Sequence, residues 1–253
     1  VAIAVLPLLG VLDAMSTVAK SYGHPMILLV RGGLFLSKGM ERSGVHRRLA
    51  IGMVRLCGGE KSDGKMKPKW LMLGFMLAAA VLSMWISNTA TTLMLLPIAL
   101  AILDGGSEED GVNPLAAPLM MSIAYAASVG GLGSPIGTPP NLVFMEQYGE
   151  ATGKVMTFTA WMGCGVPVVV LMLPLMWLWL SQNQKGEIDL DLPKAGDWRP
   201  AERRTLLVFA LTALACMPTV EPFGGWRSWL RFLEPNKPSV LFVAFPFLFS
   251  LPN

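Results

Sequence analysis

Charged side chains are scarce in this sequence: Asp, Glu, Lys and Arg make up 15% of its 253 residues, whereas hydrophobic residues make up 53%. A soluble globular chain usually carries about 25% charged residues, because its surface must face water. The few charges gather in short segments at 41–69, 104–110, 185–204 and 221–237, with nearly uncharged stretches between them. This distribution excludes an ordinary soluble domain and is typical of membrane-embedded segments joined by aqueous loops.

Histidine and cysteine are also rare, with two and three residues respectively. The cysteines lie far apart and show no metal-ligand spacing, so we interpret them as small apolar residues of packed helices. His24 and His46 form no pair at helical spacing, which argues against a haem-bearing redox subunit. A hydrolase needs a nucleophile with a nearby base, but both histidines lie far from Ser87 in the sequence. A dinucleotide-binding enzyme needs a glycine fingerprint, which the glycines at 131–137 do not match. We therefore predict that the protein is not an enzyme.

The N-terminal part is predicted to supply scaffold helices. Residues 1–12 are apolar with no charged segment before them, and we interpret them as part of a membrane helix rather than a signal peptide. Residues 25–40 form the next apolar stretch, although Arg31 and Lys38 are costly to bury in lipid. Residues 41–58 place four arginines between apolar positions at helical spacing. This pattern predicts an amphipathic helix at the membrane interface.

Residues 70–103 form a long apolar stretch with one polar interruption, the Ser-Asn-Thr triplet at 87–89. As one helix it would run about 50 Å, which exceeds the ~30 Å hydrocarbon core of a bilayer. The arms on either side of the triplet, 70–86 and 90–103, would measure about 25 Å and 21 Å. We therefore predict a re-entrant hairpin whose tip lies inside the membrane. Two short spans joined by an external turn remain the alternative.

A second interruption follows a predicted helix of small and apolar residues at 114–129. The segment 130–141 is rich in glycine and ends in adjacent prolines, which cannot continue a helix. Apolar residues resume at 142–145, so we expect a broken helix with unwound backbone at membrane depth. Such backbone is tolerated only where it is buried in protein or lines a wet cavity. Residues 161–180 predict an ordinary span with tryptophans near its ends, 206–217 predict a shorter one, and 240–251 begin another.

Lysine and arginine predict the orientation of these segments. Eight lie in residues 41–69 and five in 181–204, whereas each of the other predicted loops contains three or fewer. The positive-inside rule places these two loops in the cytoplasm of a multi-pass protein of the cell membrane, either an inner or a plasma membrane. Between the two loops the hairpin crosses zero or two times, and the next two helices cross once each, so the crossings agree with the rule.

Interrupted helices with polar residues near the midplane are how secondary transporters build ion and substrate sites. A dehydrated sodium ion needs several oxygen ligands, which Ser and Asn side chains and free carbonyls provide. An anion needs donors, which the N–H groups of a helix N-terminus provide with a favourable dipole. If Ala90 begins the second arm, Asn88 and Thr89 lie at such an N-terminus, and Ser83 and Ser87 face one side of the first arm. Ordinary capping and turn roles stay open for these residues.

Two motifs resemble the divalent-anion/sodium symporter family, which includes sodium-dicarboxylate and sodium-citrate cotransporters. They are Ser-Met-Trp-Ile-Ser-Asn-Thr-Ala-Thr at 83–91 and Gly-Leu-Gly-Ser-Pro-Ile-Gly-Thr-Pro-Pro-Asn at 131–141; segments 22–25 and 40–48 are also similar. In that family a Ser-Asn-Thr motif marks a re-entrant hairpin tip in each of two inverted repeats. The resemblance covers nearly the whole chain and implies an all-α, polytopic membrane protein of the inverted-repeat transporter class.

The resemblance implies sodium-coupled symport of di- or tricarboxylates such as succinate, malate or citrate. It assigns a sodium site to Ser83, Ser87, Asn88 and the backbone at Gly137, and contacts with the substrate carboxylate to Asn88, Thr89 and Thr138. Sodium would be the coupling ion, with no other metal and no cofactor. The expected partners are the anion, the lipid bilayer and a second copy in a homodimer, and not nucleic acid. The alternatives left open are another anion such as sulfate, a sodium-independent dicarboxylate exchanger and, remotely, a membrane-embedded enzyme or redox subunit.

The same resemblance implies a division of the chain. Residues 1–69 would be scaffold helices and an interfacial helix, 70–159 the transport-domain hairpin and broken helix, 160–200 the last helix of the first repeat with a cytoplasmic linker, and 201–253 the truncated start of a second repeat. One Ser-Asn-Thr motif is present, and we expect its counterpart to follow residue 253. Arg31 and Lys38 depart from the apolar pattern that the family leads us to expect.

Overall fold

The computed structural model describes residues 25–58, 65–104, 113–184, 188–189 and 198–216. The apolar segments predicted at 1–12 and 240–251 lie outside the described residues. Within the described part, the chain forms eight α-helices, one 3-10 turn and two strands of two residues each. The all-α prediction is confirmed, and the short strand pair is an addition that the sequence did not indicate.

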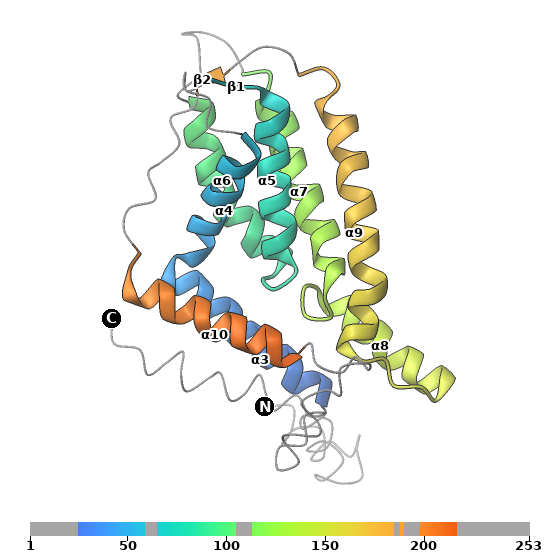
Figure 1. The fold of residues 1–253 in the computed structure, drawn as a ribbon. Helices are drawn as coiled ribbons and strands as arrows, with labels where there is room; N and C mark the ends of the chain where they lie inside the picture. The colour runs from blue at the N-terminus through green and yellow to red at the C-terminus, as the bar shows by residue number, and fades with distance from the viewer. Residues whose placement is uncertain (1–24, 59–64, 105–112, 185–187, 190–197, 217–253) are drawn as a thin grey trace, which may run out of the picture.

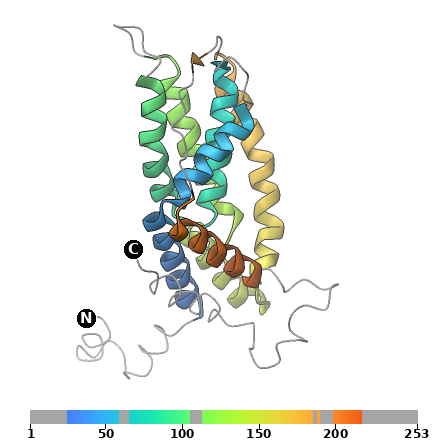
Figure 2. The ribbon, with the colours of Figure 1, turned by 60° about the vertical axis from the view of Figure 1, so that its left-hand side comes forward.

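Four helices run side by side and form the body of the molecule (Figures 1 and 2). They are α5 (Pro68–Ser83), α6 (Asn88–Asp104), α7 (Ala116–Gly130) and α9 (Phe158–Ser181). Helix α5 contacts all three of the others and also α4 (Val45–Gly58). The hydrophobic core therefore centres on α5, whose Leu71, Met72 and Phe75 are fully buried.

Small residues set the distance between α5 and its neighbours. A methyl group added at Gly130 of α7 would lie 2.4 Å from the Cα atom of Ala80, and one added at Gly74 of α5 would lie 2.7 Å from the Cα atom of Val54. Both clashes are with backbone, which cannot rotate away as a side chain can. The backbones of α4, α5 and α7 can approach this closely only because these positions carry no side chain.

Helices α5 and α6 form the predicted hairpin, joined by residues 84–87 (Figure 1). The boundaries of its arms differ from those expected. The first arm ends at Ser83, and the second begins at Asn88, because the Ser87 hydroxyl accepts a hydrogen bond from the backbone N–H of Ala90 and caps the helix. The hairpin itself is present, and the depth of its tip in the membrane stays a prediction.

The broken helix is also present. Helix α7 continues into the 3-10 turn η1 (Gly131–Gly133), the chain then runs without helix through residues 134–138, and α8 (Pro139–Thr152) follows. The adjacent prolines lie in the first turn of α8, where their missing N–H groups are not needed. They therefore begin a new helix, which crosses one end of the bundle (Figure 1).

Two helical segments of the described part are long and apolar enough to cross a membrane, Ala116–Gly133 and Phe158–Ser181. Only 11% of the second is buried, so most of its apolar surface faces outward, where lipid would contact it. Helices α5 and α6 are shorter apolar helices, as expected for a re-entrant hairpin. Helices α3 (Pro25–Ser43) and α10 (Pro200–Cys216), which overlap predicted membrane segments, do not meet the same criterion.

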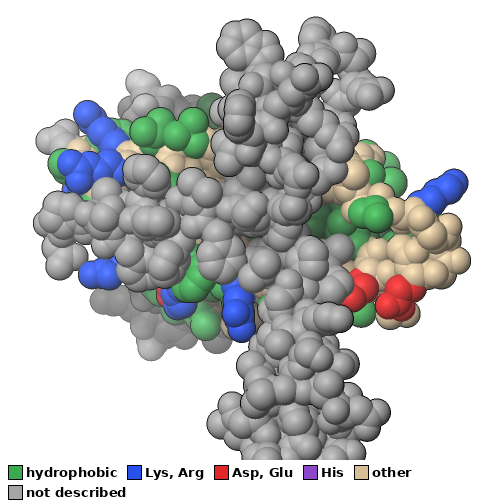
Figure 3. All heavy atoms as spheres, turned by 90° about the horizontal axis from the view of Figure 1, so that it is seen from below, with side chains coloured by type: hydrophobic (Ala, Val, Ile, Leu, Met, Phe, Trp, Pro, Cys, Tyr) green, Lys and Arg blue, Asp and Glu red, His purple; other side chains and the backbone are tan. Residues whose placement is uncertain are grey.

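Helices α3, α8 and α10 lie at one end of the bundle, which Figure 3 views directly. There the acidic side chains lie toward the side of α8, and most of the basic ones lie toward the opposite side. Helix α3 extends through Ser43 and ends at Gly44, whose φ of +77° favours glycine, so the predicted helix boundary at residue 41 is three residues too early. Helix α4 is amphipathic as predicted, with Val54 buried and Arg55 exposed, and its apolar face packs on α5.

Short parts of the two lysine- and arginine-rich loops meet at the other end of the bundle (Figure 1). Strand β1 (Lys65–Met66) pairs antiparallel with β2 (Ile188–Asp189), with Lys65 opposite Asp189. Both strands lie in the loops 41–69 and 181–204 that the positive-inside rule places together. This pairing brings parts of the two ranges together, but Arg48 and Glu202 of the same ranges pair at the end where α10 lies. The location of these loops on one side of the membrane, and in the cytoplasm, stays a prediction.

A buried ion pair joins α4 to α10. The Arg48 Nε atom lies 2.7 Å from the Glu202 Oε2 atom, and the two side chains are only 14% and 8% exposed. The backbone N–H of Arg199 donates to the same oxygen at 2.8 Å, and the Arg48 guanidinium lies 5.0 Å from the centre of the Trp198 ring. Burial raises the pKa of Glu202, but the Arg199 N–H and the Arg48 guanidinium outweigh it, so this pKa lies below its usual value.

Candidate ion and substrate site

The two interrupted segments meet in the structure. We call residues 83–89 the tip and residues 131–138 the loop. The hydroxyl of Ser134 in the loop donates a hydrogen bond to the backbone carbonyl of Met84 in the tip, fifty residues earlier in the chain. A methyl group added at Gly137 would lie 2.8 Å from the carbonyl oxygen of Ser83 and 2.5 Å from that of Gly131. Motifs that are distant in the sequence therefore form one site.

Uncharged oxygen atoms gather where the tip contacts the loop. Ser83 is fully buried, and its hydroxyl donates to the Asn88 Oδ1 atom at 2.6 Å. The same Oδ1 atom lies against the loop, because a methyl group added at Gly131 would come within 2.4 Å of it. The carbonyl oxygens of Ser83 and Gly131 lie beside Gly137, as described above. Oxygen-only ligand sets of this kind are what hard cations prefer, and coupling-ion sites of transporters use unwound carbonyls in the same way.

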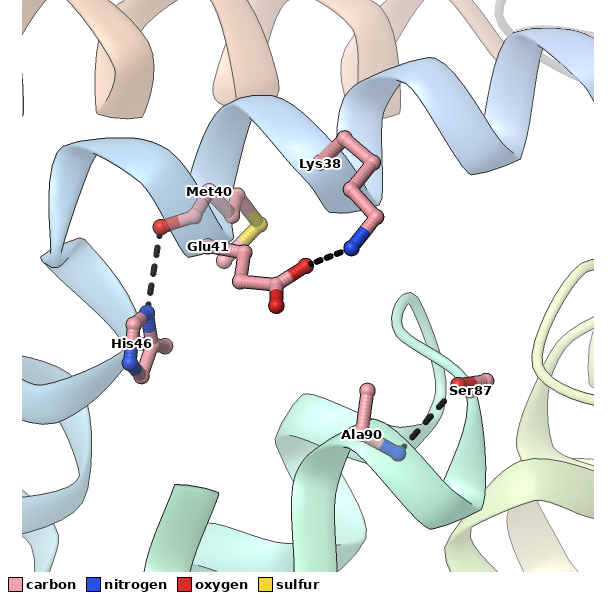
Figure 4. Close-up of polar contacts among 6 residues, drawn as sticks. All are labelled: Lys38, Met40, Glu41, His46, Ser87 and Ala90. Carbon is pink, nitrogen blue, oxygen red and sulfur yellow. Dashed lines mark hydrogen bonds and ion pairs between the residues drawn. The ribbon is translucent and has the colours of Figure 1, made fainter. Parts of the chain in front are cut away.

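Ser87 does not share the environment of Ser83. The expectation that both hydroxyls face one side of a continuous helix is wrong, because α5 ends at Ser83 and a turn follows it. Ser87 is exposed, and its hydroxyl lies 3.3 Å from the backbone nitrogen of Ala90 at the start of α6 (Figure 4). Its location in the tip still leaves it available as a ligand.

The predicted substrate residues lie at helix starts. Asn88 and Thr89 are the first residues of α6, and Thr138 directly precedes α8 with an extended backbone (φ −145°). Thr89 is exposed, whereas Asn88 and Thr138 are half-buried. Two helices thus begin within the tip and the loop, and the N-terminal end of a helix dipole favours negative charge. At α6 the backbone N–H groups of Asn88 and Thr89 have no partner within the helix. At α8 the first two residues are prolines without N–H groups, so the Thr138 side chain is the donor there.

Helix α3 covers part of the loop. A methyl group added at Gly33 would lie 2.2 Å from the Ile136 Cγ2 atom, so the two segments are in close contact. The charges that departed from the family pattern lie on the outside of this helix: Arg31 is exposed, and exposed Lys38 forms an ion pair with Glu41 at 2.5 Å (Figure 4). Both charges therefore lie outside the contact between α3 and the loop.

Three side chains hold the loop in place. The amide nitrogen of Asn141 on α8 donates to the carbonyl oxygens of Gly131 and Ser134, both at 2.8 Å. The Ser134 hydroxyl accepts from the backbone N–H of Gly137 at 3.2 Å. On α9, the Trp161 Nε1–H donates to the carbonyl of Leu132 at 2.9 Å. Backbone that has lost its helical hydrogen bonds is therefore satisfied by side chains, as it must be away from water.

Sequence comparison assigns the chain to a family. A family model described as "Citrate transporter" (CitMHS) matches residues 1–245. The chain belongs to the citrate transporter family. This membership confirms the resemblance that the two motifs suggested, and the family is one of transporters rather than enzymes.

Two relatives of this citrate transporter family member carry the name "Sodium-dependent dicarboxylate transporter SdcS". The protein of Staphylococcus saprophyticus is 37% identical over 159 residues, which cover 60% of this chain and 29% of the relative. That of Staphylococcus aureus strain NCTC 8325 is 35% identical over 174 residues, which cover 66% and 32%. The chain thus matches about a third of the length of these relatives.

Two residues at this contact, Ser134 and Asn141, were not among those predicted from the sequence of this family member. Both lie inside the second quoted motif, but a serine beside a proline and an asparagine after two prolines read as ordinary turn residues. Their signal was the unwound backbone itself, whose carbonyls and N–H groups required partners. The sequence does not show which side chains supply them.

Proposed function

We propose that this protein carries out sodium-coupled symport of di- or tricarboxylates, such as succinate, malate or citrate, across the cell membrane. The observation that carries the proposal is the contact between tip and loop, where uncharged oxygens lie together beside two helix N-termini. Uncharged oxygens suit a sodium ion, and helix N-termini suit a carboxylate. The sodium-dependent dicarboxylate transporters among its relatives support the same assignment.

In this proposal the sodium ligands are Ser83, Ser87, Asn88 and the backbone at Gly137. The Asn88 oxygen already faces both Ser83 and the loop, so a cation beside it would contact both segments. Binding of the ion would then stabilise the contact between tip and loop in one arrangement.

The substrate carboxylate is proposed to contact Asn88, Thr89 and Thr138 at the starts of α6 and α8. Because Asn88 would serve both ligands, each ligand favours the geometry that the other needs. Such coupling is reciprocal: if sodium strengthens anion binding, the anion strengthens sodium binding by the same factor.

Transport further requires the site to open to each side of the membrane in turn. We propose that residues 70–159 move as a transport domain against a scaffold that includes residues 1–69, in a homodimer with loops 41–69 and 181–204 in the cytoplasm. The close backbone packing of α5 on α7 supports movement of these helices as one unit. Helix α4 packs on α5 in the same way at Gly74, so in this proposal it would move with them although it lies within residues 1–69.

The decisive experiment is uptake of radiolabelled succinate and citrate by the full-length protein in proteoliposomes, titrated with sodium and with potassium as the control cation. We expect uptake to require an inward sodium gradient and to be inhibited by unlabelled dicarboxylates. Uptake that is indifferent to sodium would indicate an exchanger instead. Inhibition by sulfate but not by succinate would indicate a transporter of another anion.

A further inference from the structure

We propose that Ser134 is a positioning residue of the sodium site: its hydroxyl holds the loop against the tip and does not itself contact the ion. The proposal rests on the proposed function and extends it to a residue outside the assigned ligands. Ser134 is fully buried between the two segments that would share the ion.

The hydrogen bonds of Ser134 occupy its whole capacity. Its hydroxyl donates to the carbonyl of Met84 and accepts from the backbone N–H groups of Ile136, at 3.3 Å, and Gly137, at 3.2 Å. A hydroxyl has one donor and two acceptor lone pairs, so none remains for a cation. This saturation distinguishes Ser134 from Ser83, whose hydroxyl donates to a side-chain oxygen within the tip.

The partners of Ser134 are next to the proposed ligands on both sides. Met84 directly follows Ser83 in the tip, and Gly137 is the residue whose backbone is proposed to bind sodium. One side chain therefore controls the separation of the two ligand groups. Replacing a residue that orients a metal ligand without contacting the metal commonly lowers metal affinity or activity by about 10- to 100-fold.

Asn141 strengthens this arrangement from α8. It is 3% exposed, and its amide nitrogen donates to the carbonyl of Ser134 itself as well as to that of Gly131. The loop backbone around Ser134 is thus held at its carbonyl by Asn141, and the Ser134 hydroxyl is directed at the tip. The direction of the Ser134 side chain is set by buried neighbours rather than by chance in a mobile turn.

The test compares Ser134→Ala with Ser122→Ala. Ser122 is an equally buried serine of the same broken helix, but its hydroxyl donates to the Pro118 carbonyl within α7 at 2.7 Å. For Ser134→Ala we expect the sodium concentration for half-maximal uptake to rise about tenfold, while the KM for succinate at saturating sodium changes less than about twofold. Ser122→Ala should change neither value.

A second pair of variants tests the proposal even if the alanine variant misfolds. Ser134→Thr and Ser134→Val introduce side chains of nearly equal shape that differ in the hydroxyl, and binding of radioactive sodium to the purified protein measures the site without transport. We expect the threonine variant to bind sodium better than the valine variant. Equal binding by the two, or a sodium requirement of Ser134→Ala no higher than that of Ser122→Ala, would overturn the positioning role. Wild-type uptake that ignores sodium would overturn the proposed function instead.

Discussion

The tip and the loop contribute to the same site by different means. In the tip, polar side chains face the site: the Ser83 hydroxyl and the Asn88 oxygen lie 2.6 Å apart. In the loop, Gly131 and Gly137 bring backbone to the site, and that backbone is held by the side chains of Ser134 in the loop and Asn141 on α8. Removing side-chain atoms should therefore damage the tip directly, whereas adding atoms or removing a supporting hydrogen bond should damage the loop.

The largest effect is expected from adding an atom to the loop. In Gly137→Ala the new methyl group would lie 2.5 Å from the Gly131 carbonyl oxygen, and backbone on both sides would have to shift. We expect sodium-driven succinate uptake to fall at least about tenfold. The matched control is Gly163→Ala on the exposed face of α9, where a methyl group meets nothing within 4 Å. Normal sodium dependence of Gly137→Ala would contradict the close approach of loop and tip.

Removing a side chain from the tip should come next. Asn88→Ala removes an oxygen proposed to bind sodium and a group proposed to contact the carboxylate. We expect both the sodium concentration for half-maximal uptake and the KM for succinate to rise about tenfold, because hydrogen bonds to charged groups contribute about 1.5–3 kcal/mol each. Ser128→Ala is a suitable control, since the exposed Ser128 hydroxyl donates to the Ala124 carbonyl within α7, away from Asn88 and Thr89 in the sequence. A change in only the sodium requirement or only the KM for succinate would contradict the shared role of Asn88.

Ser83→Ala and Thr138→Ala should have smaller effects, the first on sodium binding and the second on anion binding. Ser83 lies buried behind Asn88, so its loss should raise the sodium requirement by about three- to tenfold and affect the anion only through coupling. Thr138, at the start of α8, should do the reverse and change the preference between succinate and citrate. Titrations of sodium at fixed anion, and of each anion at saturating sodium, measure both effects. Identical profiles for the two variants would contradict the separate assignments.

The smallest effect on transport is expected outside the tip and the loop, at the Arg48–Glu202 pair. Because the folded-state pKa of Glu202 is lowered, its ionised form stabilises the fold above its unfolded pKa of ~4.3, and this contribution is lost as the pH falls through the lower folded value. Glu202→Gln should lower the Tm by about 2–4 °C at pH 7. The difference from wild type should shrink below about pH 4, with unchanged sodium dependence at pH 7. Thermal unfolding in detergent at several pH values measures it, and a constant difference would contradict the pair.

The sequence predicted the pattern of helices because its signals are local. The Ser-Asn-Thr triplet and the glycine–proline segment interrupt apolar stretches, and the structure has both interruptions where the sequence placed them. The helix boundaries were less accurate: α6 begins at Asn88, two residues before Ala90, and α3 passes residue 41 to end at Ser43. Caps depend on one hydrogen bond, whose partner the apolar pattern does not specify.

Contacts between distant segments were beyond the sequence. Nothing in the residue pattern pairs Lys65 with Asp189 or Arg48 with Glu202, since each pairing depends on how the helices pack. The same holds for Ser134, whose hydroxyl reaches the Met84 carbonyl only because Gly130 lets α7 approach the backbone of α5.

By itself the sequence determined that this chain enters a membrane, that it is helical and that two of its helical stretches are broken by polar or flexible residues. These properties follow from hydrophobicity, from the missing N–H of proline and from the short range of helical hydrogen bonds. The tertiary structure decided that the two breaks meet, and which groups face each other there. Backbone exposed by a break must find hydrogen-bond partners within the protein. Ser134 and Asn141 are such partners in a fold where α5 and α7 pack closely through glycine and alanine.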